Sequence, residues 1–165
     1  MKMAEALLPE FDREMTTTRT VLERVPDDKL DWKPHAKSFS LGELASHIAT
    51  LPAWGTETIN RSELDIGVTP QPAALPSKAA VLAAFDAHAT GARAALVGAS
   101  DADLMATWTL TRHGKALFSM PKTVVLRSFV FNHLIHHRGQ MTVYLRLLNV
   151  PVPSLYGPSA DEPAF

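Results

Sequence analysis

Two histidines one helical turn apart, His133 and His137, lie in the last strongly helical stretch of this chain. Because an α-helix advances about 100° per residue, positions four apart lie only about 40° from each other around its axis. Projected in this way, both histidines fall on one apolar stripe about 80° wide. The stripe consists of Leu126, Val130, His133, His137, Met141, Tyr144 and Leu148. A fold that buries this stripe must also bury two imidazoles, which is costly unless both rings find partners.

Three earlier stretches carry apolar residues at helical spacing, and their boundaries follow from residues that begin or end helices. Ser40 and Glu43 form a capping box that starts the second helix. Ser77 caps a third, alanine-rich helix, which ends at Gly98. The expected helices are therefore 4–25, one that starts after residue 40, 77–98, and one from about 121 to 149.

Four long helices with one apolar face each are most simply packed as an antiparallel bundle. Two segments do not read as helix. Residues 61–76 form the most loop-like stretch and are rich in proline. Residues 105–120 surround a turn at 112–115, which predicts a small hairpin or irregular segment before the last helix. With 165 residues, we expect one all-α domain, a four-helix bundle spanning 1–165.

The composition excludes several classes of protein. The chain has no cysteine, so a disulfide scaffold, a thiolate nucleophile and a cysteine-type zinc site are ruled out. The net charge is -1 and there is no basic run, which argues against nucleic acid or an anionic membrane as the main partner. No stretch approaches the roughly 18 apolar residues of a membrane span, and the N-terminus does not resemble a signal peptide. We therefore expect a cytoplasmic protein.

A divalent metal held by both rings would remove the cost of burying His133 and His137. Two ligands make an incomplete site, since stable zinc-type sites usually have three or four protein ligands. The best third candidate is His47, which lies on the inner face of the second helix between Leu44 and Leu51. Because inner faces meet in a bundle, the three imidazoles are predicted to converge on one ion. Three ligands leave one position open for water, which the metal would acidify.

The segment that contains the histidine pair resembles the signature of the DinB/YfiT superfamily of metalloenzymes. Three further segments agree with that family in the same order along the chain: 30–34, 41–49, and 144–146 followed by 152–158. The signature segment reads Asn132-His133-x-x-His136-His137-Arg138-Gly139-Gln140.

The resemblance implies a four-helix bundle with a long crossover and a divalent metal, often nickel or zinc. It also implies that His47, His133 and His137 are the metal ligands, in agreement with the helical projection. Dimers are common in the family, so we expect a homodimer. Some relatives are thiol-dependent transferases or isomerases that use bacillithiol or mycothiol.

Two functions from different classes follow. The first is a metal-dependent enzyme that acts on a small molecule, either as a transferase or isomerase with a low-molecular-weight thiol or as a hydrolase with metal-bound water. The second is a non-catalytic bundle in which the metal is structural and holds two helices together. Three neutral ligands with an open position fit catalysis better, because structural sites usually have four protein ligands.

Four neighbours of the histidine pair have less defined roles. His136 is rotated by roughly 60° from His133 and is expected to pack or hydrogen-bond elsewhere, on a second stripe with Phe129, Val143 and Leu147. Asn132 and Gln140 either orient ligands or serve packing. Arg138 projects away from the ligands, which predicts a place on the helix surface or a contact with the tail.

Three residues elsewhere in the chain bear on the same site. His88, at the edge of the third helix's apolar face, is expected to be a partly buried structural residue instead of a fourth ligand. Asp161 and Glu162 lie in the aperiodic tail and could reach the mouth of the site.

Overall fold

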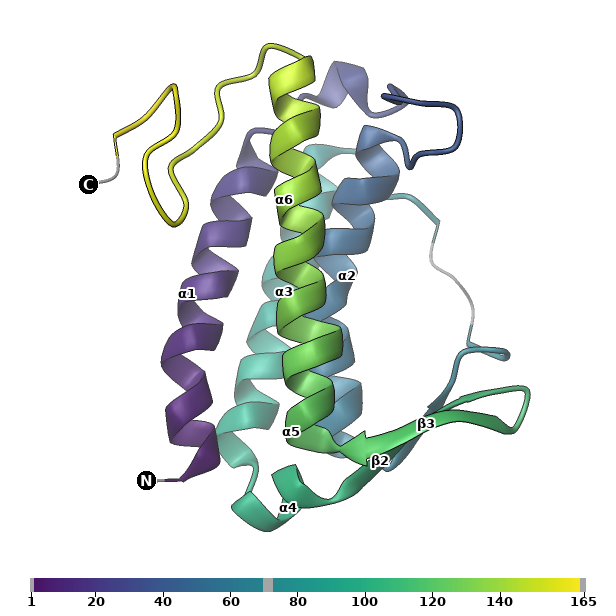
Figure 1. Ribbon diagram of the computed structural model, residues 1–165. Helices are drawn as coiled ribbons and strands as arrows, with labels where there is room; N and C mark the ends of the chain where they lie inside the picture. The colour runs from purple at the N-terminus through teal and green to yellow at the C-terminus, as the bar shows by residue number, and fades with distance from the viewer. Residues whose placement is uncertain (1, 70–72, 164–165) are drawn as a thin grey trace.

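The computed structural model describes residues 2–69 and 73–163 and shows a mostly helical protein with a small three-stranded sheet (Figure 1). The helices are α1 (Met3–Glu23), α2 (Leu41–Asn60), α3 (Lys78–Gly98), α4 (Asp101–Met105), α5 (Lys122–Val125) and α6 (Asn132–Leu147). A short 3-10 turn spans Asp27–Lys29, and a π-helical segment spans Leu126–Phe131. The strands are β1 (Glu63–Asp65), β2 (Thr107–Arg112) and β3 (Lys115–Pro121).

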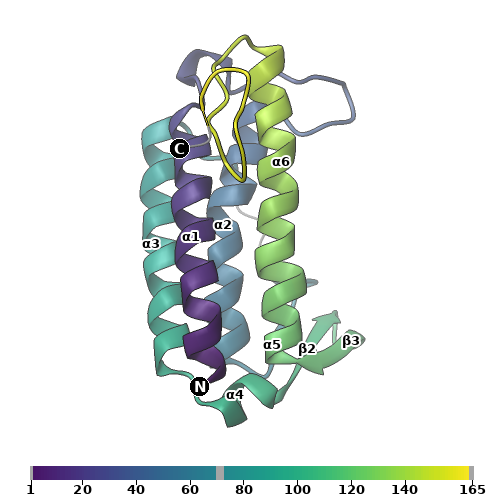
Figure 2. The same ribbon diagram turned by 60° about the vertical axis from the view of Figure 1, so that its left-hand side comes forward.

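The long helices α1, α2, α3 and α6 stand side by side around a common core (Figures 1 and 2). The predicted starts of α2 and α3 are confirmed, because Ser40 accepts a hydrogen bond from the Glu43 amide and Ser77 accepts one from the Ala80 amide. Their antiparallel packing is a wrong prediction, since α2 and α3 run in the same direction. The Lys78 amide donates a hydrogen bond to Asp27, which follows α1, so α3 starts at the same end of the molecule as α2 (Figure 1).

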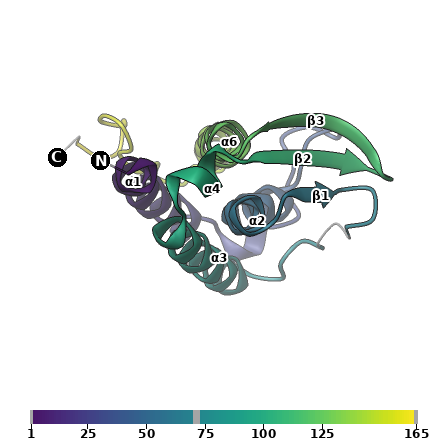
Figure 3. The ribbon, with the colours of Figure 1, turned by 90° about the horizontal axis from the view of Figure 1, so that it is seen from below.

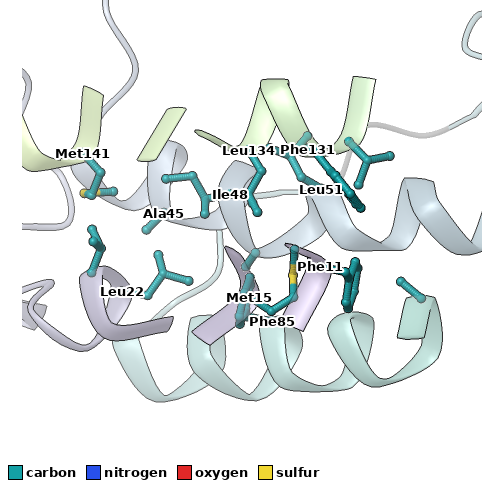
Figure 4. Packing of buried hydrophobic residues seen from close by; sticks show 14 of the residues in the cluster. Phe11, Met15, Leu22, Ala45, Ile48, Leu51, Phe85, Phe131, Leu134 and Met141 are labelled. Atoms are coloured by element: carbon teal, nitrogen blue, oxygen red, sulfur yellow. The ribbon is translucent and has the colours of Figure 1, made fainter. Parts of the chain in front are cut away.

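The core between these helices is apolar and tightly closed. Figure 4 shows side chains from all four long helices meeting there, among them Leu22, Ile48, Phe85 and Leu134. Each of these four is at most 1% exposed, and burying a side chain of this kind contributes about 1.5–3 kcal/mol. The helical patterning of the sequence is therefore accounted for by this one core.

A three-stranded sheet projects beyond α2 and α6, as seen from below in Figure 3. The hairpin of β2 and β3 with its turn between Arg112 and Lys115 was predicted. The third strand was not, and it corrects the all-α expectation: β1 pairs in parallel with β2, with Glu63 opposite Thr109. β1 lies within the stretch that reads as loop, because a strand of three residues shows no alternation of its own.

Asp65 fastens the crossover to the hairpin turn. Its carboxylate accepts hydrogen bonds from the backbone amides of Gly67 (2.7 Å), His113 (2.9 Å) and Gly114 (2.7 Å). These bonds, the one from Gly114 foremost, hold the pKa of Asp65 below its usual value. A Cβ on Gly67 would lie only 2.5 Å from the His113 nitrogen, so the approach of the two segments requires glycine at this position.

The last helix is not regular along its predicted length. It consists of α5, the π-helical segment and α6, and the amide of Asn132 bonds to the carbonyl of Arg127 five residues earlier. The apolar stripe survives this change of winding, since Leu126, Val130 and Met141 are all buried. Both histidines lie after the π-helical segment, within regular α6, so the four-residue spacing between them keeps its expected meaning.

Arg138 corrects the prediction of a surface position. Its side chain is only 1% exposed and forms an ion pair of 2.7 Å with the buried Glu14 of α1. The predicted contact with the tail is present, because the guanidinium donates to the Tyr156 hydroxyl (2.6 Å), which in turn donates to Glu14 (2.9 Å). Figure 2 shows the tail folded back between α1 and α6, where this group lies.

Candidate metal centre

The structure brings together three histidines from two helices. His47 extends from the second turn of α2, and His133 and His137 extend from successive turns of α6. The Nε2 atoms of His47 and His133 are 3.3 Å apart, and those of His133 and His137 are 2.9 Å apart. All three nitrogens lie within 4.8 Å of one another, so the group could hold a metal ion.

The outer nitrogens of two rings are already engaged. The Nδ1 atom of His137 lies 2.7 Å from the side-chain oxygen of Gln140 and therefore donates its hydrogen to it. The carbonyl of Phe129, in the π-helical segment, accepts a hydrogen bond from His133. In a neutral imidazole one nitrogen carries the hydrogen and the other carries a lone pair. The Nε2 atom of His137 therefore carries a lone pair that faces the cluster.

Burial keeps these rings neutral. It lowers the pKa of His47 to about 4, with the nearby charges of His137 and His133 acting in the same direction. Burial also lowers the pKa of His133 and His137, while hydrogen bonds to Phe129 and Gln140 oppose the shift. The three rings are consequently unprotonated at neutral pH, as metal ligation requires.

The spacing of the nitrogens suits a tetrahedral ion. Ligand nitrogens at about 2.0–2.1 Å from zinc lie roughly 3.4 Å apart in tetrahedral geometry. The separations of 3.3 Å and 2.9 Å are near this value. A cation among the three nitrogens would attract the lone pair of each neutral ring that faces it. The donor set therefore fits a divalent metal.

A cavity of about 700 Å³ opens beside His47. One wall is a half-buried stripe on α2 that continues from Glu43 through His47 and Trp54 to Glu57. The opposite sides come from the crossover and from His88 on α3. The lining residues are Phe39, Glu43, Ser46, His47, Thr50, Ala53, Trp54, Glu57, Leu64, Ile66, Thr69, Ala73, Ala74 and His88. This volume is sufficient for a small organic molecule.

Comparison with known proteins identifies the family. The DinB family profile matches residues 1–164. The chain belongs to the DinB family. It is 28% identical over 155 residues to the uncharacterized protein YrdA of Bacillus subtilis strain 168, covering 94% of this chain and 89% of that protein.

Solved DinB-like structures share the fold. A DinB-like protein from Bacillus cereus ATCC 10987 superimposes with a TM-score of 0.71 at 26% identity, covering 92% of this chain and 97% of that one. The DinB-like protein YjoA of Bacillus subtilis gives a TM-score of 0.71 at 18% identity, covering 90% and 95% of the two chains. The predicted family is thus confirmed.

The remaining candidate residues lie outside the histidine cluster. The expected packing of the second stripe is wrong for His136, which is exposed, and for Val143 and Leu147, which are each 57% exposed. Phe129, the fourth member of the stripe, is half-buried and stacks on Phe118 with ring centroids 4.6 Å apart. Nδ1 of His88 donates to the carbonyl of Ala49 (2.9 Å), which gives that residue the expected structural role. Asn132 is exposed at the start of α6.

The tail carboxylates are occupied elsewhere. Asp161 pairs with Arg146, and Glu162 pairs with Arg24. The suggestion that they reach the mouth of the site is therefore wrong. Sequence reasoning missed instead the role of the α2 stripe, although the spacing of Glu43, His47 and Glu57 places them on one helix face.

No helix within residues 2–69 and 73–163 is long and apolar enough to cross a membrane.

Proposed function

We propose that this protein is a divalent-metal-dependent enzyme with a three-histidine centre and an open coordination position. The observation that carries the proposal is the clustering of three neutral imidazole nitrogens, from His47, His133 and His137, of which His47 also lines a cavity of about 700 Å³. A purely structural site would be expected to have four protein ligands. Within the described chain, the cluster holds three groups able to ligate a metal.

Each residue of the site has a physical task in this function. The three rings would hold the ion through Nε2, and Gln140 fixes the orientation of His137 through Nδ1. When bound, the ion supplies a Lewis acid with an exchangeable position at the cavity. The apolar residues of the cavity would exclude water from a bound small molecule.

The reaction class is proposed from this geometry together with the family resemblance. A thiol-dependent transferase or isomerase would use the exchangeable position for a thiol, and a hydrolase would use it for water. Nickel and zinc are the proposed metals, since imidazole is a suitable ligand for both. The homodimer and the cytoplasmic location remain predictions, and sedimentation of the purified protein would test the first.

The test begins with metal analysis of protein purified without a tag or chelator, followed by calorimetric titration with zinc. We expect one ion per chain. Replacing His47, His133 or His137 with alanine should weaken binding by more than about 100-fold, beyond the loss typical of an orienting partner. The matched control is His136→Ala, an exposed histidine of the same helix, which should keep most of the affinity. Metal loss in this control with retention in His133→Ala would overturn the ligand assignment.

Cobalt substitution then separates an enzyme site from a structural one. In the cobalt-loaded protein, an added thiol, azide or carboxylate should change the visible spectrum by entering the open position. A spectrum that responds to none of them would indicate a closed site and favour the structural role of the metal.

A further inference from the structure

We propose that the cavity lined by His47 selects an apolar molecule whose far end carries an amine or a similar hydrogen-bond donor, and that it disfavours phosphates and carboxylates. This inference rests on the proposed function, because it concerns the molecule that would occupy the cavity next to the metal.

The walls are apolar over much of their area. Phe39 and Trp54 supply aromatic surface on the α2 side, and Leu64 and Ile66 supply aliphatic surface from β1 and the residue after it. The Phe39 ring centroid is 5.9 Å from that of His47, so aromatic surface continues up to the histidine cluster. A flat apolar body can therefore lie between α2 and the crossover.

The charged groups that line the cavity are carboxylates. Glu43 and Glu57 contribute to the wall, and neither lysine nor arginine does so among the described residues. Glu43 is neutralised locally, since it accepts from the Ser40 amide and pairs with Lys33. Glu57 pairs through Oε2 with Arg61, whose side chain is 63% exposed and lies outside the lining. Both compensating cations lie outside the lining, so an anion in the cavity would contact the carboxylates and neither of their cations.

The uncharged polar groups of the lining present acceptors. The hydroxyls of Thr50 and Thr69 already donate to the carbonyls of His47 and Asp65. His88 donates through Nδ1 to Ala49, which leaves its Nε2 as an acceptor when the ring is neutral. Ser46 has no free donor, since its hydroxyl donates to the Gly42 carbonyl, and it also accepts from the Leu75 amide. A ligand that brings hydrogen-bond donors matches these walls, whereas one that brings only acceptors does not.

The test uses three benzyl mercaptans that share a thiol anchor and an aromatic body. They differ at the para position, which carries an aminomethyl group, a methyl group or a carboxylate. Each is titrated into the cobalt-loaded protein, and the thiolate-to-cobalt absorption band reports binding at the metal. We expect the amine to bind most tightly and the carboxylate most weakly, with a ratio of at least about tenfold between them.

Two variants of Glu57 test the origin of the preference. Glu57→Gln should reduce the amine-to-carboxylate ratio severalfold, and Glu57→Lys should favour the carboxylate. Glu23→Gln is the matched control, because Glu23 also pairs with an arginine four residues away but lies on α1, away from the cavity. It should leave the ratio unchanged.

The outcomes separate this inference from the function on which it rests. If all three thiols produce the absorption band with equal affinity, or if the carboxylate binds best, the inference is wrong and the open metal position stands. A ratio that persists in both Glu57 variants also contradicts it. If no thiol produces the absorption band, the result contradicts both the open metal position and this inference.

Discussion

At the scale of single residues, Gln140 is the group whose role is most directly measurable. Its oxygen accepts the Nδ1 hydrogen of His137, and an orienting partner of this kind typically raises metal affinity 10- to 100-fold. We therefore expect Gln140→Leu to weaken zinc binding by about that factor, as measured by calorimetry. Asn132→Leu, a change at another exposed amide of α6, serves as the control. Equal affinities in the two variants would show that Gln140 does not orient the ring.

The same scale shows what sequence periodicity can predict. His47, His133 and His137 were placed on inner faces by angle alone, and the structure brings them together. Arg138 could not be placed in this way, because its burial depends on Glu14 of another helix. Periodicity describes one helix at a time, and a charged residue paired across two helices looks the same as an exposed one.

At the scale of elements, the ion pair between α6 and α1 also anchors the tail. Arg138→Met removes one buried charge and leaves Glu14 without its partner, which should destabilise the protein by about 3–5 kcal/mol. The double variant Arg138→Met with Glu14→Leu should recover much of that loss, since no unpaired charge remains. Urea denaturation of both variants measures the difference. A double variant less stable than Arg138→Met would contradict this account.

Some helices and strands could be predicted from the sequence and others could not. The starts of α2 and α3 were predictable because Ser40 and Ser77 cap them through local hydrogen bonds. β1 and the parallel course of α2 and α3 were not, because both depend on contacts between residues far apart in the chain. The π-helical segment likewise has no signal in the apolar spacing around it.

At the scale of the whole molecule, stability should depend on pH through the histidine cluster. The pKa of His47 falls from 6.5 to about 4 on folding, so between these values the unfolded chain binds a proton that the native protein does not. The contribution of His47 to the free energy of unfolding of the metal-free protein should therefore be complete above pH 6.5 and should decrease as the pH falls toward 4. Added zinc should raise stability most above pH 6.5, where the ligands are neutral.

Urea denaturation from pH 4 to 8, with and without zinc, checks this expectation. The variant His47→Gln should show a shallower slope between pH 4 and 6.5 without metal, and it should gain much less from zinc. A wild-type curve that is flat over this interval would show that the cluster does not couple protonation to folding.

The fastening of the crossover by Asp65 has a consequence for how this fold can diversify. The histidines stand on two long core helices, whereas one side of the cavity is a surface segment held to a hairpin by two bonds to a single carboxylate and by the pairing of β1 with β2. Insertions and substitutions in that segment change the space next to the reacting group without touching the helices that carry it. The reactive centre and part of the cavity wall that would determine selectivity thus lie on different segments of the chain, which can change independently. A lineage could exchange one molecule for another while keeping its chemistry.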